Sequence, residues 1–456
     1  MIGIADYAVY IPRHRLRREV IAAAWNTVAM PGCKAAVNFD EDSLTMAQSA
    51  AWPLVARNSP AALSFASTTS PYWQRSVAGV IAAACDLPAE TATADFAGSL
   101  RAGTTALRAA LDMVNAGSAA SAAVTSADCR DGAPESTEEK LFGDAAAAVA
   151  VGCKNLAAEL VASLSRADDF PDEWRRDTDA HVRSFASKYS LTRGYMENVA
   201  AAGRALFAKA GVRPEQIARA AFTSPDGRAH LAAAKALGIP AARVEDVRVG
   251  DIGITGAAMP LFLLAQALDR AQSGDLILLI AYGDGADAFL FRAMGSGGRL
   301  QTGGPTMEYA TYQIYRKLRD WRASAGSAEI SNVLLRREEA QNVRLHGSLC
   351  PECGALQFPI AQVCASCHHR GLTAKPLARR GRLFTFTKDF LYTAPVEPTV
   401  MAVVDLDGGG RFLCQMTDID PAEVQIGMEV ELVLRRMREG AGDHYYYWKC
   451  RPSPVP

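Results

Sequence analysis

The sequence has no apolar run of 18 residues, so we expect no helix that would span a membrane. It also lacks an excess of one charge, because 48 Lys and Arg residues nearly balance 49 Asp and Glu residues. This balance argues against the basic surface that nucleic acids or anionic membranes require, although a local basic cluster could still bind a small phosphate-bearing ligand. The first residues, MIGIADYAVYIPRHRL, contain no apolar core of a signal peptide. We therefore expect a cytoplasmic protein without nucleic-acid or membrane partners.

Cysteines arranged as a disulfide framework are also lacking. Six of the ten cysteines stand singly, mostly in apolar segments, which is typical of reduced and buried thiols. These six are Cys33, Cys85, Cys129, Cys153, Cys414 and Cys450.

The other four cysteines form two C-x2-C knuckles in the stretch CPECGALQFPIAQVCASC. They are Cys350, Cys353, Cys364 and Cys367. This spacing predicts four thiolates around one tetrahedral ion, zinc or less often iron. Because cysteine fills all four positions, we expect the ion to be structural rather than catalytic. His368 and His369 follow directly and are interpreted as surface residues, with surplus ligands as the alternative.

Two stretches of the chain repeat one order of elements. In residues 95–152 a small-residue turn leads into the helix LRAALDMVNAG and the strands AAVTSAD and FGDAAAAVAVG. In residues 245–291 the turn EDVRVGDIGITGA leads into the helix PLFLLAQALDRAQSG and the strands of DLILLIAYGDGADAFLF. Earlier in each copy a strand opens into a Pro-containing loop, LSFASTTSPYWQR and AAFTSPDGRAH. This alternation predicts an α/β fold that is duplicated over residues 1 to about 300.

The character of the sequence changes after Phe291. GSGGRLQTGGP predicts a hinge, and TMEYATYQIYRKLRDWRASAG predicts a helix whose aromatic face serves packing, with a ligand-binding face as the alternative. Beyond the cysteine knuckles the segments GRLFTFTKDFLYTAP, TVMAVVDLDGGGRFLCQMTD, MEVELVLRRM and HYYYWKCRP are β-rich and separated by turns. They predict a small all-β barrel.

Several blocks resemble the hydroxymethylglutaryl-CoA synthase family of the thiolase superfamily. They are MIGIADYAVYIPRHRL, FDEDSLTMAQSAA, SPYWQRSVAGVIAA, LFGDAAAAVAVG, FPDEWRRD and YGDGADAFLF, in that order, and the similarity covers about residues 1–325. From Leu349 onward the chain is similar to acyl-CoA-associated proteins that join a rubredoxin-like zinc ribbon to an OB-fold, through FPIAQVCASC and GRLFTFT. That module typically accompanies a thiolase-like partner as a separate chain. The protein therefore resembles a fusion of the pair.

The resemblance implies a duplicated five-layer αβαβα thiolase-like fold, followed by a small zinc ribbon and an all-β OB-fold. We expect residues 1–165 to form the N-terminal thiolase-like half and residues 166–325 the C-terminal half with its trailing helix. Residues 326–371 would hold the linker and the zinc ribbon, and residues 372–456 the OB-fold domain. The resemblance also implies a homodimer formed through the thiolase-like fold, and coenzyme A thioesters as ligands.

Three catalytic positions of the synthases look replaced. Their nucleophilic cysteine lies in a pattern like D-x-x-x-A-C-Y-x-G-T, where DFAGSLRAGT has Leu100. Their acidic residue in G-S-E-S-x-P-Y matches Thr68 of ASTTSPY, and their histidine matches Thr223 of AFTSPDG. The resemblance therefore does not imply acyl-cysteine chemistry here. Ser99 and Cys129 are interpreted as a helix-capping turn residue and a structural thiol, with a nucleophilic role as the alternative for each.

Breaking or forming the bond between Cα and Cβ of a 3-hydroxyacyl-CoA needs no cysteine. A retro-aldol step requires a base for the β-hydroxyl proton and donors for the thioester enolate. The turn GSLRAGTT keeps backbone N–H groups at a helix start, and some thiolase-like proteins with zinc-ribbon/OB-fold partners are retro-aldolases. The sequence therefore favours an acyl-CoA C–C lyase or condensing enzyme. The alternatives are a non-catalytic pseudo-synthase that supports an active thiolase-like partner and, third, Claisen condensation.

Candidate bases lie in the loops of both repeats. Asp251 occupies the second repeat's turn, where the family usually carries an Asn, and is either the base or a turn-capping residue. His230 follows Asp226 by four residues, so the carboxylate could orient the imidazole; a satisfied structural histidine is the alternative. Tyr72 matches the family's block at the pocket wall, and it either contacts substrate or packs.

A binding site for coenzyme A is predicted in EWRRDTD. Trp174 offers a stacking surface beside Arg175 and Arg176, which could pair with phosphates; a solvated charged turn is the alternative. Asp144 and Asp284 lie in strand-to-strand turns of the two repeats and are interpreted as structural.

Overall fold

The computed structural model describes residues 1–456 except 186, 296–305, 321–330, 392–397, 441–442 and 454–456. The chain forms two compact units. The first comprises Met1–Val37, Asp42–Ala82 and Leu87–Tyr312, and the second comprises Asn38–Glu41, Ala83–Asp86 and Gln313–Pro456. Two four-residue segments of the N-terminal region therefore belong to the same unit as the C-terminal part of the chain.

The first unit is built on a nine-stranded mixed sheet with two similar halves. One half has the order β5 (Ala92–Phe96), β4 (Ala62–Ala66), β6 (Ala122–Asp128), β7 (Ala145–Gly152) and β1 (Gly3–Tyr10). The other half has the order β8 (Ala158–Ala167), β13 (Gly285–Ala293), β12 (Leu276–Tyr282) and β11 (Ile217–Phe222). The halves join where Gly3 of β1 pairs with Glu159 of β8 and Ile4 with Ala158.

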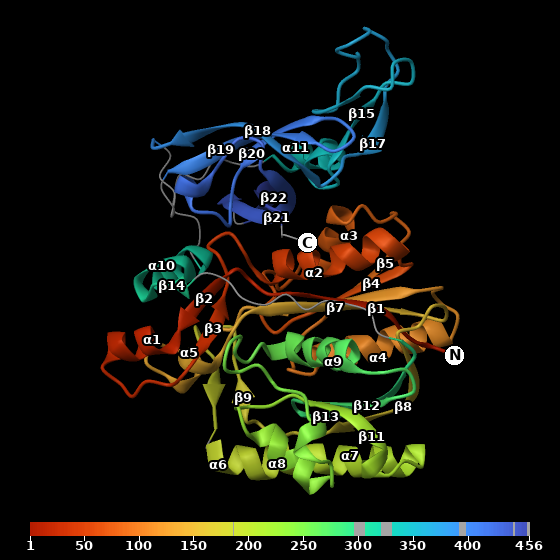
Figure 1. The fold of residues 1–456 in the computed structure, drawn as a ribbon, viewed down its shortest axis with the longest axis vertical. Helices are drawn as coiled ribbons and strands as arrows, with labels where there is room; N and C mark the ends of the chain where they lie inside the picture. Colours follow the sequence, from red (N-terminus) through yellow and green to blue (C-terminus); the bar gives the residue numbers. More distant parts are fainter. Residues whose placement is uncertain (186, 296–305, 321–330, 392–397, 441–442, 454–456) are drawn as a thin grey trace. The chain divides into compact units, whose positions relative to one another are not determined.

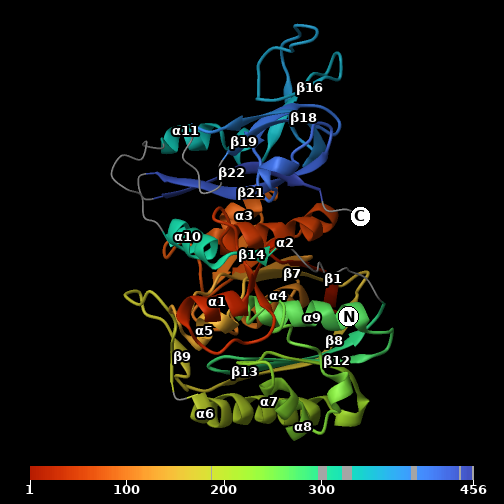
Figure 2. The same cartoon turned by 60° about the vertical axis from the view of Figure 1, so that its left-hand side comes forward.

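Three helical layers enclose these two halves (Figures 1 and 2). The outer layers are α2 (Ser43–Asn58) with α3 (Val77–Ala84), and α7 (Glu197–Ala210) with α8 (Ala229–Ala236); the middle layer is α4 (Ala102–Asn115) with α9 (Met259–Arg270). Helix α9 packs against strands of both halves, and every residue from Met259 to Leu268 is buried. A helix that is apolar on all sides suits such a central layer. The arrangement confirms the predicted five-layer αβαβα fold.

The predicted duplication is visible in the pairing of the strands. In the first half β4 and β6 are parallel and β6 and β7 antiparallel; in the second half β11 and β12 are parallel and β12 and β13 antiparallel. The counterpart of β5 is a parallel bridge between Ala220 and Val244. Strands β6, β7 and β12 are buried along their whole length, as expected for apolar strands covered on both faces.

Smaller elements complete the first unit. A three-stranded sheet contains β14 (Thr306–Met307), β2 (His14–Arg17) and β3 (Cys33–Ala36), and a two-stranded one contains β9 (Glu173–Trp174) and β10 (Arg183–Ser184). Short helices are α1 (Arg18–Trp25), α5 (Thr137–Leu141), α6 (Ser187–Tyr189) and the π-helical turn Ser190–Met196.

The predicted aromatic helix after the hinge is α10 (Tyr309–Asp320). Tyr312 is buried, and Lys34 Nζ donates a hydrogen bond of 2.9 Å to its hydroxyl. Tyr309 donates a hydrogen bond to Glu139. These contacts agree with a packing role; the end of the predicted helix, including Trp321, and most of the predicted hinge lie outside the described residues.

The second unit contains a small ribbon and a barrel-like sheet. The ribbon has the order β16 (Leu356–Gln357), β15 (His346–Leu349) and β17 (Thr373–Pro376), preceded by α11 (Asn332–Arg337) and α12 (Glu339–Asn342). The larger sheet has the order β20 (Arg411–Gln415), β19 (Thr399–Leu406), β18 (Arg380–Asp389), β21 (Glu429–Gly440) and β22 (Asp443–Pro452). Alternate residues of β19 and β20 are buried, as in a barrel strand with one face inward. The strands lie where the turn-punctuated segments predicted them.

Within the described ranges, no helix is both long enough and apolar enough to cross a membrane.

Candidate functional site

The turn between β5 and α4 is the centre of the candidate site. Gly98 has φ +82°, which lets the chain reverse between the end of the strand and the start of the helix. The Ser99 hydroxyl accepts a hydrogen bond of 3.2 Å from Arg101 N–H, and Ser99 O accepts one of 2.9 Å from Ala102 N–H. Ser99 therefore stabilises the turn before the helix, whose N-cap position is occupied by Arg101 and receives no side-chain cap. Leu100 lies at the apex and is partly exposed.

The turn between β12 and β13 lies against Leu100. A Cβ atom added to Gly283 would come within 2.9 Å of Leu100 Cβ and 3.2 Å of Leu100 N. Arg101 holds this turn in place, since its guanidinium donates to Asp284 O at 2.8 Å and also bonds to Gly283 O. The same guanidinium pairs with buried Asp287 at 3.1 Å. One turn from each repeat, the β5–α4 turn of the first and the β12–β13 turn of the second, thus meet at Leu100.

The loop Ser67–Thr69 is anchored by the carboxylate of Asp128, at the end of β6. Asp128 is completely buried. It accepts hydrogen bonds from Ser67 Oγ (2.8 Å), Thr68 N (2.7 Å), Thr68 Oγ1 (2.7 Å), Thr69 N (3.2 Å), Thr69 Oγ1 (3.1 Å) and Ala257 N (2.7 Å). Ser67 N–H also donates to Phe96 O, at the end of β5. Asp128 therefore fixes the loop that carries Thr68 together with the second repeat's turn at Ala257.

Sequence reasoning missed Asp128 and Arg101. The sequence position of each could have marked it as a candidate, because Asp128 ends a buried strand and Arg101 directly follows the apex of the turn. Their partners, however, come from distant segments, so neither residue type nor spacing identified their roles.

Thr223 also borders the turn at Gly283. Its hydroxyl accepts a hydrogen bond of 2.9 Å from Tyr282 N–H, and its carbonyl accepts one of 2.8 Å from Tyr195 OH. The structure thus connects Thr223 to Leu100 through residues 282 and 283. Thr68 is linked to the β5–α4 turn, because the N–H of its neighbour Ser67 donates a hydrogen bond to Phe96 O at the end of β5.

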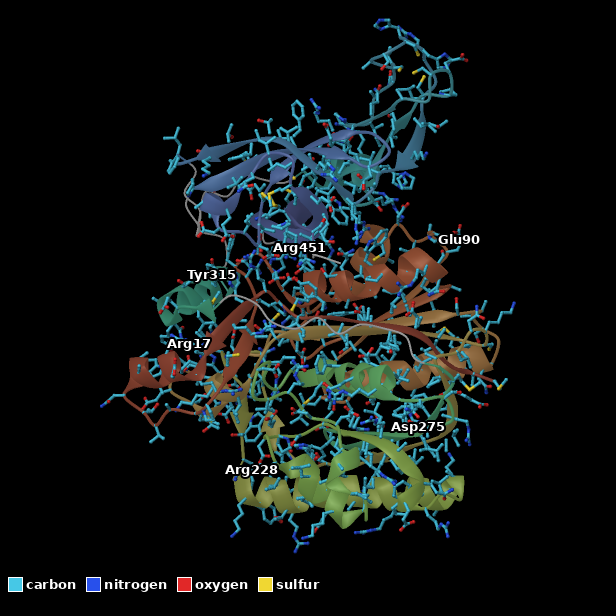
Figure 3. The ribbon with its side chains drawn as sticks, in the orientation of Figure 1. Arg17, Glu90, Arg228, Asp275, Tyr315 and Arg451 are labelled. Atoms are coloured by element: carbon cyan, nitrogen blue, oxygen red, sulfur yellow. The ribbon has the colours of Figure 1, made fainter. Side chains whose placement is uncertain are left out.

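His230 is buried near the start of α8, with 5% of its surface exposed. Asp226 does not orient the imidazole by a hydrogen bond; its carboxylate instead accepts from the N–H groups of Arg228 and Ala229, each at 2.7 Å, and so caps the helix. Arg228 is labelled in Figure 3. Burial lowers the pKa of His230, against the smaller opposing effect of the carboxylates of Asp246 and Asp226. The neutral imidazole is therefore the favoured form near pH 7.

The lowered pKa of His230 predicts how the stability of the protein depends on pH. An unfolded histidine has a pKa of about 6.5, and the folded value lies below it. As the pH falls below about 6.5, the unfolded chain binds the proton first, so stability falls with decreasing pH until the folded pKa is passed. We expect a His230→Gln variant to lose less stability than the parent between pH 7.5 and pH 5.5 in urea unfolding. Parallel losses in both proteins would contradict a depressed pKa.

Asp251 lies beside β3. Its carboxylate is 48% exposed and forms a bidentate ion pair with Arg248, whose Nε lies 2.9 Å from both Asp251 Oδ1 and Asp251 Oδ2. This hydrogen bond raises the pKa of Arg248. The Asp251 carbonyl accepts from the Cys33 thiol at 3.4 Å. Within the described part of the chain, Asp251 and His230 share no hydrogen bond or ion pair.

Tyr72 contacts a neighbouring arginine. Its hydroxyl accepts a hydrogen bond of 2.8 Å from Arg75, whose guanidinium also lies 4.9 Å from the Tyr72 ring centre.

The predicted coenzyme A segment lies next to the Ser67–Thr69 loop, because Arg175 donates to Thr68 O at 3.0 Å. Trp174 is 39% exposed, so its indole is accessible for stacking. Arg176 instead pairs with Asp179 and lowers the pKa of that carboxyl.

Other predicted structural residues have contacts that suit that role. Asp144 is buried and accepts from Val37 N–H at 2.9 Å, and Asp284 occupies a left-handed turn position at φ +46°. Cys129 is buried, and its N–H donates to Thr69 Oγ1 at 2.9 Å.

The four cysteines of the ribbon come together as predicted. Their Sγ atoms all lie within 4.8 Å of one another, with Cys350–Cys367 at 3.6 Å and Cys353–Cys364 at 3.5 Å. A tetrahedral zinc ion with Zn–S bonds of about 2.3 Å separates its sulfurs by about 3.8 Å, so the cluster fits such an ion.

The two knuckles have matching backbones. Cys350 O accepts from Gly354 N–H and Cys364 O from His368 N–H, and both donors have positive φ, +72° and +60°. His368 therefore forms part of the knuckle turn and is exposed, in agreement with its interpretation as a surface residue.

The duplicated five-layer fold, with a helix-start turn where both repeats meet, defines a thiolase-like protein. Residues 207–292 match the family described as "3-Oxoacyl-[acyl-carrier-protein (ACP)] synthase III C terminal", and residues 374–435 match "ChsH2, C-terminal OB-fold domain". The hydroxymethylglutaryl-CoA synthase of Methanopyrus kandleri is 31% identical over 340 residues, which cover 70% of this chain and 97% of that protein. The Pyrococcus horikoshii synthase is 33% identical over 63% of this chain and 85% of its own length. The chain belongs to the hydroxymethylglutaryl-CoA synthase family.

Solved structures share the fold. A hydroxymethylglutaryl-CoA synthase complexed with CoA aligns with a TM-score of 0.63 at 17% identity, over 73% of this chain and 94% of its own. A 3-oxoacyl-[acyl-carrier-protein] synthase III from Aquifex aeolicus aligns with a TM-score of 0.57 at 23% identity, over 64% of this chain and all of its own. The chain is thus a thiolase-superfamily member of an acyl-CoA enzyme family, and the OB-fold domain follows the part that these relatives share.

Proposed function

We propose that this protein cleaves the Cα–Cβ bond of a 3-hydroxyacyl-CoA by a retro-aldol reaction, without a cysteine nucleophile. The observation that carries the proposal is Leu100 at the apex of the turn where the resemblance places the nucleophile. A leucine side chain cannot form an acyl-enzyme, but its backbone N–H still lies at the helix start beside Gly283. The turn therefore keeps the means to stabilise an oxyanion while lacking the means for acyl transfer.

The chemistry balances without an added reagent. A base removes the β-hydroxyl proton, the Cα–Cβ bond breaks, and its electron pair forms the thioester enolate while the Cβ carbon becomes a ketone or aldehyde carbonyl. Protonation of the enolate at Cα gives the shortened acyl-CoA. Backbone N–H groups at the turn would hold the enolate oxygen, and removal of one such donor typically costs on the order of 10²-fold in rate.

Asp251, His230 and Tyr72 remain the proposed candidates for the base and for substrate contact. His230 is neutral near pH 7 because burial lowers its pKa, so its imidazole is free to accept a proton. Asp251 forms an ion pair with Arg248 and is 48% exposed. Tyr72 lies three residues after Thr69, the last residue of the anchored loop. We propose Trp174 and Arg175 as coenzyme A contacts, because one is exposed for stacking and the other reaches Thr68 O. Arg176 is the weakest member of that predicted set, since Asp179 already holds it.

We also propose that the four-cysteine cluster binds structural zinc and that the protein forms a homodimer. The dimer proposal is supported by β5, which lies at the edge of the sheet and is exposed from Ala92 to Asp95. An uncovered edge strand offers backbone groups to a second chain. Light scattering of the purified protein should give twice the mass of the chain, and the mass of a single chain would refute the dimer.

The test of the function is mass-spectrometric product analysis. Purified, zinc-loaded protein is incubated with 3-hydroxyacyl-CoA esters that include tertiary alcohols. We expect a ketone or aldehyde together with a shortened acyl-CoA, and a loss of about 10²-fold or more on replacement of the base, by Asp251→Asn or His230→Ala. Asp112→Asn, on the exposed face of α4, is the matched control and should keep full turnover.

Binding without cleavage would contradict the lyase. The protein would then fit the alternative of a non-catalytic partner, and it should co-purify with a thiolase-like chain that carries a cysteine. The same binding measurement tests the coenzyme A site: Trp174→Ala should weaken binding of the ester, by up to about tenfold for a lost stacking contact.

A further inference from the structure

Arg130 is a buried cation beside the loop of the candidate site. It lies two residues beyond Asp128, and between them the N–H of Cys129 donates to Thr69 Oγ1 at 2.9 Å. The Arg130 side chain is 4% exposed. A buried guanidinium is costly unless acceptors surround it, because its charge loses hydration and its five N–H groups need partners. The partner of each nitrogen therefore decides what the cation can do.

One side of the guanidinium is occupied by groups of the first unit. Arg130 Nη2 donates to Glu173 Oε2 at 2.6 Å, and Arg130 Cζ lies 4.0 Å from the ring centre of Phe142. The aliphatic part of the side chain lies beside Gly256, where an added Cβ atom would come within 2.6 Å of Arg130 Cδ. These contacts fix the position of the guanidinium, and the aromatic ring adds to its stabilisation.

The other terminal nitrogen is buried without a partner. Within the part of the chain that the structure describes, Arg130 Nη1 makes no hydrogen bond. Thr255, the residue before Gly256, is 2% exposed, and its Oγ1 is likewise buried with no partner among the described residues. Since the great majority of buried polar groups in proteins are paired, two such groups beside one glycine are unusual. They point to an acceptor that comes from a ligand.

Arg130 is connected to both parts of the candidate site. Through Glu173 it contacts the segment proposed to bind coenzyme A, in which Arg175 donates to Thr68 O at 3.0 Å. Through the backbone it continues from Asp128, whose carboxylate anchors the loop that carries Thr68. An acceptor bound at Arg130 Nη1 would therefore lie among the elements that the proposed function assigns to the substrate.

We propose that Arg130 binds a carboxylate in the acyl group of the substrate, with the Thr255 hydroxyl as a second donor. A carboxylate suits a half-paired guanidinium, because hydrogen bonds between oppositely charged groups are the strongest that either group makes. An aliphatic acyl chain would leave both donors buried and unpaired. The substrate class is then a coenzyme A ester of a dicarboxylic acid. The inference rests on the proposed function in taking coenzyme A thioesters as ligands, and it names the group that determines specificity.

The affinity for matched pairs of esters tests the proposal on the full, zinc-loaded chain. Titration calorimetry compares succinyl-, glutaryl- and adipyl-CoA with butyryl-, pentanoyl- and hexanoyl-CoA, which have the same numbers of acyl carbons but end in a methyl group. We expect at least one carboxylate ester to bind about ten- to hundredfold more tightly than its methyl-ended counterpart, the effect of a hydrogen bond to a charged group. None of the six esters carries a 3-hydroxyl group, so no retro-aldol cleavage accompanies the titration.

Substitutions assign this preference to the Arg130 cluster. Arg130→Gln should abolish the preference and leave the affinity for the methyl-ended ester unchanged, whereas Arg130→Lys keeps the charge and should retain part of the preference. Glu173→Gln should increase the preference, because it removes a negative charge beside the guanidinium. A purely structural role of Arg130 would not separate the two kinds of ester in this way. Arg193→Gln is the control, since Arg193 pairs with Glu197 on the exposed surface, and it should have no effect.

Three results would overturn the proposal. Equal affinities within every pair for the parent protein would mean that water, and not a substrate group, completes the contacts of Arg130. A preference that persists in Arg130→Gln would place the carboxylate elsewhere. If Arg130→Gln does not fold, Thr255→Val replaces a hydroxyl by a methyl group and should reduce the preference severalfold; an unchanged preference there would also contradict the proposal.

The result is separate from the proposed reaction. A protein that cleaves no ester can still prefer a carboxylate, and an active lyase can bind both esters of each pair equally. Failure of all six esters to bind would overturn the inference together with the proposed coenzyme A site, whereas product analysis tests the cleavage by itself.

Discussion

Replacement of Cys350 by serine is expected to release the metal and to unfold the second unit, while the main sheet of the first unit stays folded. The ribbon strands β15, β16 and β17 have only two to four residues each, so they hold little apolar surface of their own. A structural zinc site contributes about 10–16 kcal/mol of binding free energy, which is folding free energy when the site does not exist in the unfolded chain. Loss of one thiolate removes most of that contribution.

Metal release is measured with a chromogenic chelator, and unfolding with the fluorescence of Trp448, which is completely buried in the second unit. Cys153→Ser is the matched control, because Cys153 is an exposed single cysteine outside the cluster. It should change neither readout. Simultaneous loss of both units in the Cys350→Ser variant would show that they unfold as one cooperative body, and retention of metal would refute the four-cysteine site.

Asp128→Ala is expected to destabilise the first unit by roughly 3–5 kcal/mol. The carboxylate accepts six hydrogen bonds from the Ser67–Thr69 loop and from Ala257, and the donors would be left in a buried position without an acceptor. A buried donor without a partner costs about 1–3 kcal/mol, although water entering the space would satisfy some of them. Urea unfolding measures the effect as a lower midpoint with an unchanged slope.

A substitution at Gly256 also tests the role of the Asp128 carboxylate. It has φ +56°, and a Cβ atom there would come within 2.1 Å of Asp128 Oδ2, so Gly256→Ala should displace the carboxylate and destabilise in the same direction. Asp112→Asn, which removes a carboxylate from the exposed face of α4, should stay within about 0.5 kcal/mol of the parent. A loss below about 1 kcal/mol for Asp128→Ala would mean that Asp128 does not anchor the loop.

The candidate site was only partly predictable. The motif comparison identified Thr68, Leu100 and Thr223 as the positions of interest, and the structure connects all three to the turns at Phe96 and Gly283. The comparison could not show that a buried carboxylate, Asp128, holds the loop that carries Thr68.

Features that depend on short spacing could be predicted from the residues alone. The two C-x2-C knuckles bring their thiols together because each tight turn fixes two of them, and the ribbon strands then need to align only the two turns. The alternating strands of the OB-fold and the apolar helix α9 are likewise determined by local periodicity. The repeated order of turn, helix and strands was sufficient to predict the duplicated sheet.

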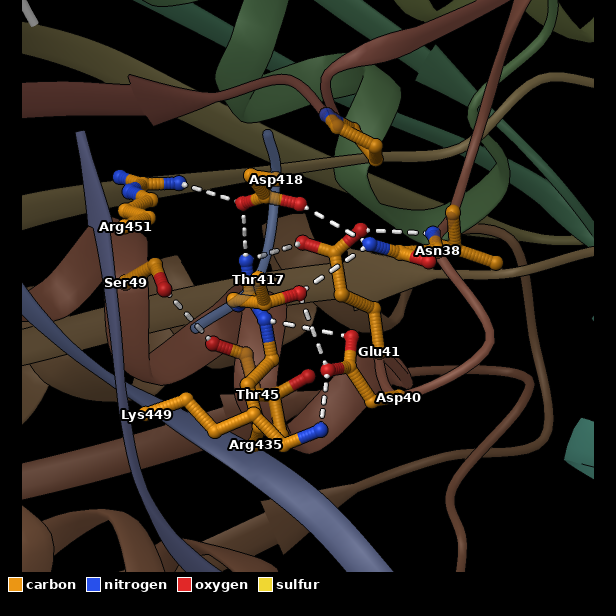
Figure 4. A network of polar contacts seen from close by, with 12 residues as sticks. Asn38, Asp40, Glu41, Thr45, Ser49, Thr417, Asp418, Arg435, Lys449 and Arg451 are labelled. Carbon is orange, nitrogen blue, oxygen red and sulfur yellow. Dashed lines mark hydrogen bonds and ion pairs between the residues drawn. The ribbon is translucent and has the colours of Figure 1, made fainter. Parts of the chain in front are cut away.

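The pairing of charges, in contrast, follows from the packing of the folded chain, as the ion pair between Asp40 and Lys449 illustrates (Figure 4). Asp40 and Lys449 are 409 positions apart, and nothing in the residues around either one indicates the other. Arg101 could have faced solvent, but it holds the turn at Gly283 and pairs with Asp287. Asp251, in the second repeat's turn, pairs with Arg248 three residues before it. Local spacing fixes how a segment turns, whereas the partner of a buried charge is fixed by the packing of whole layers, which brings distant segments to one place.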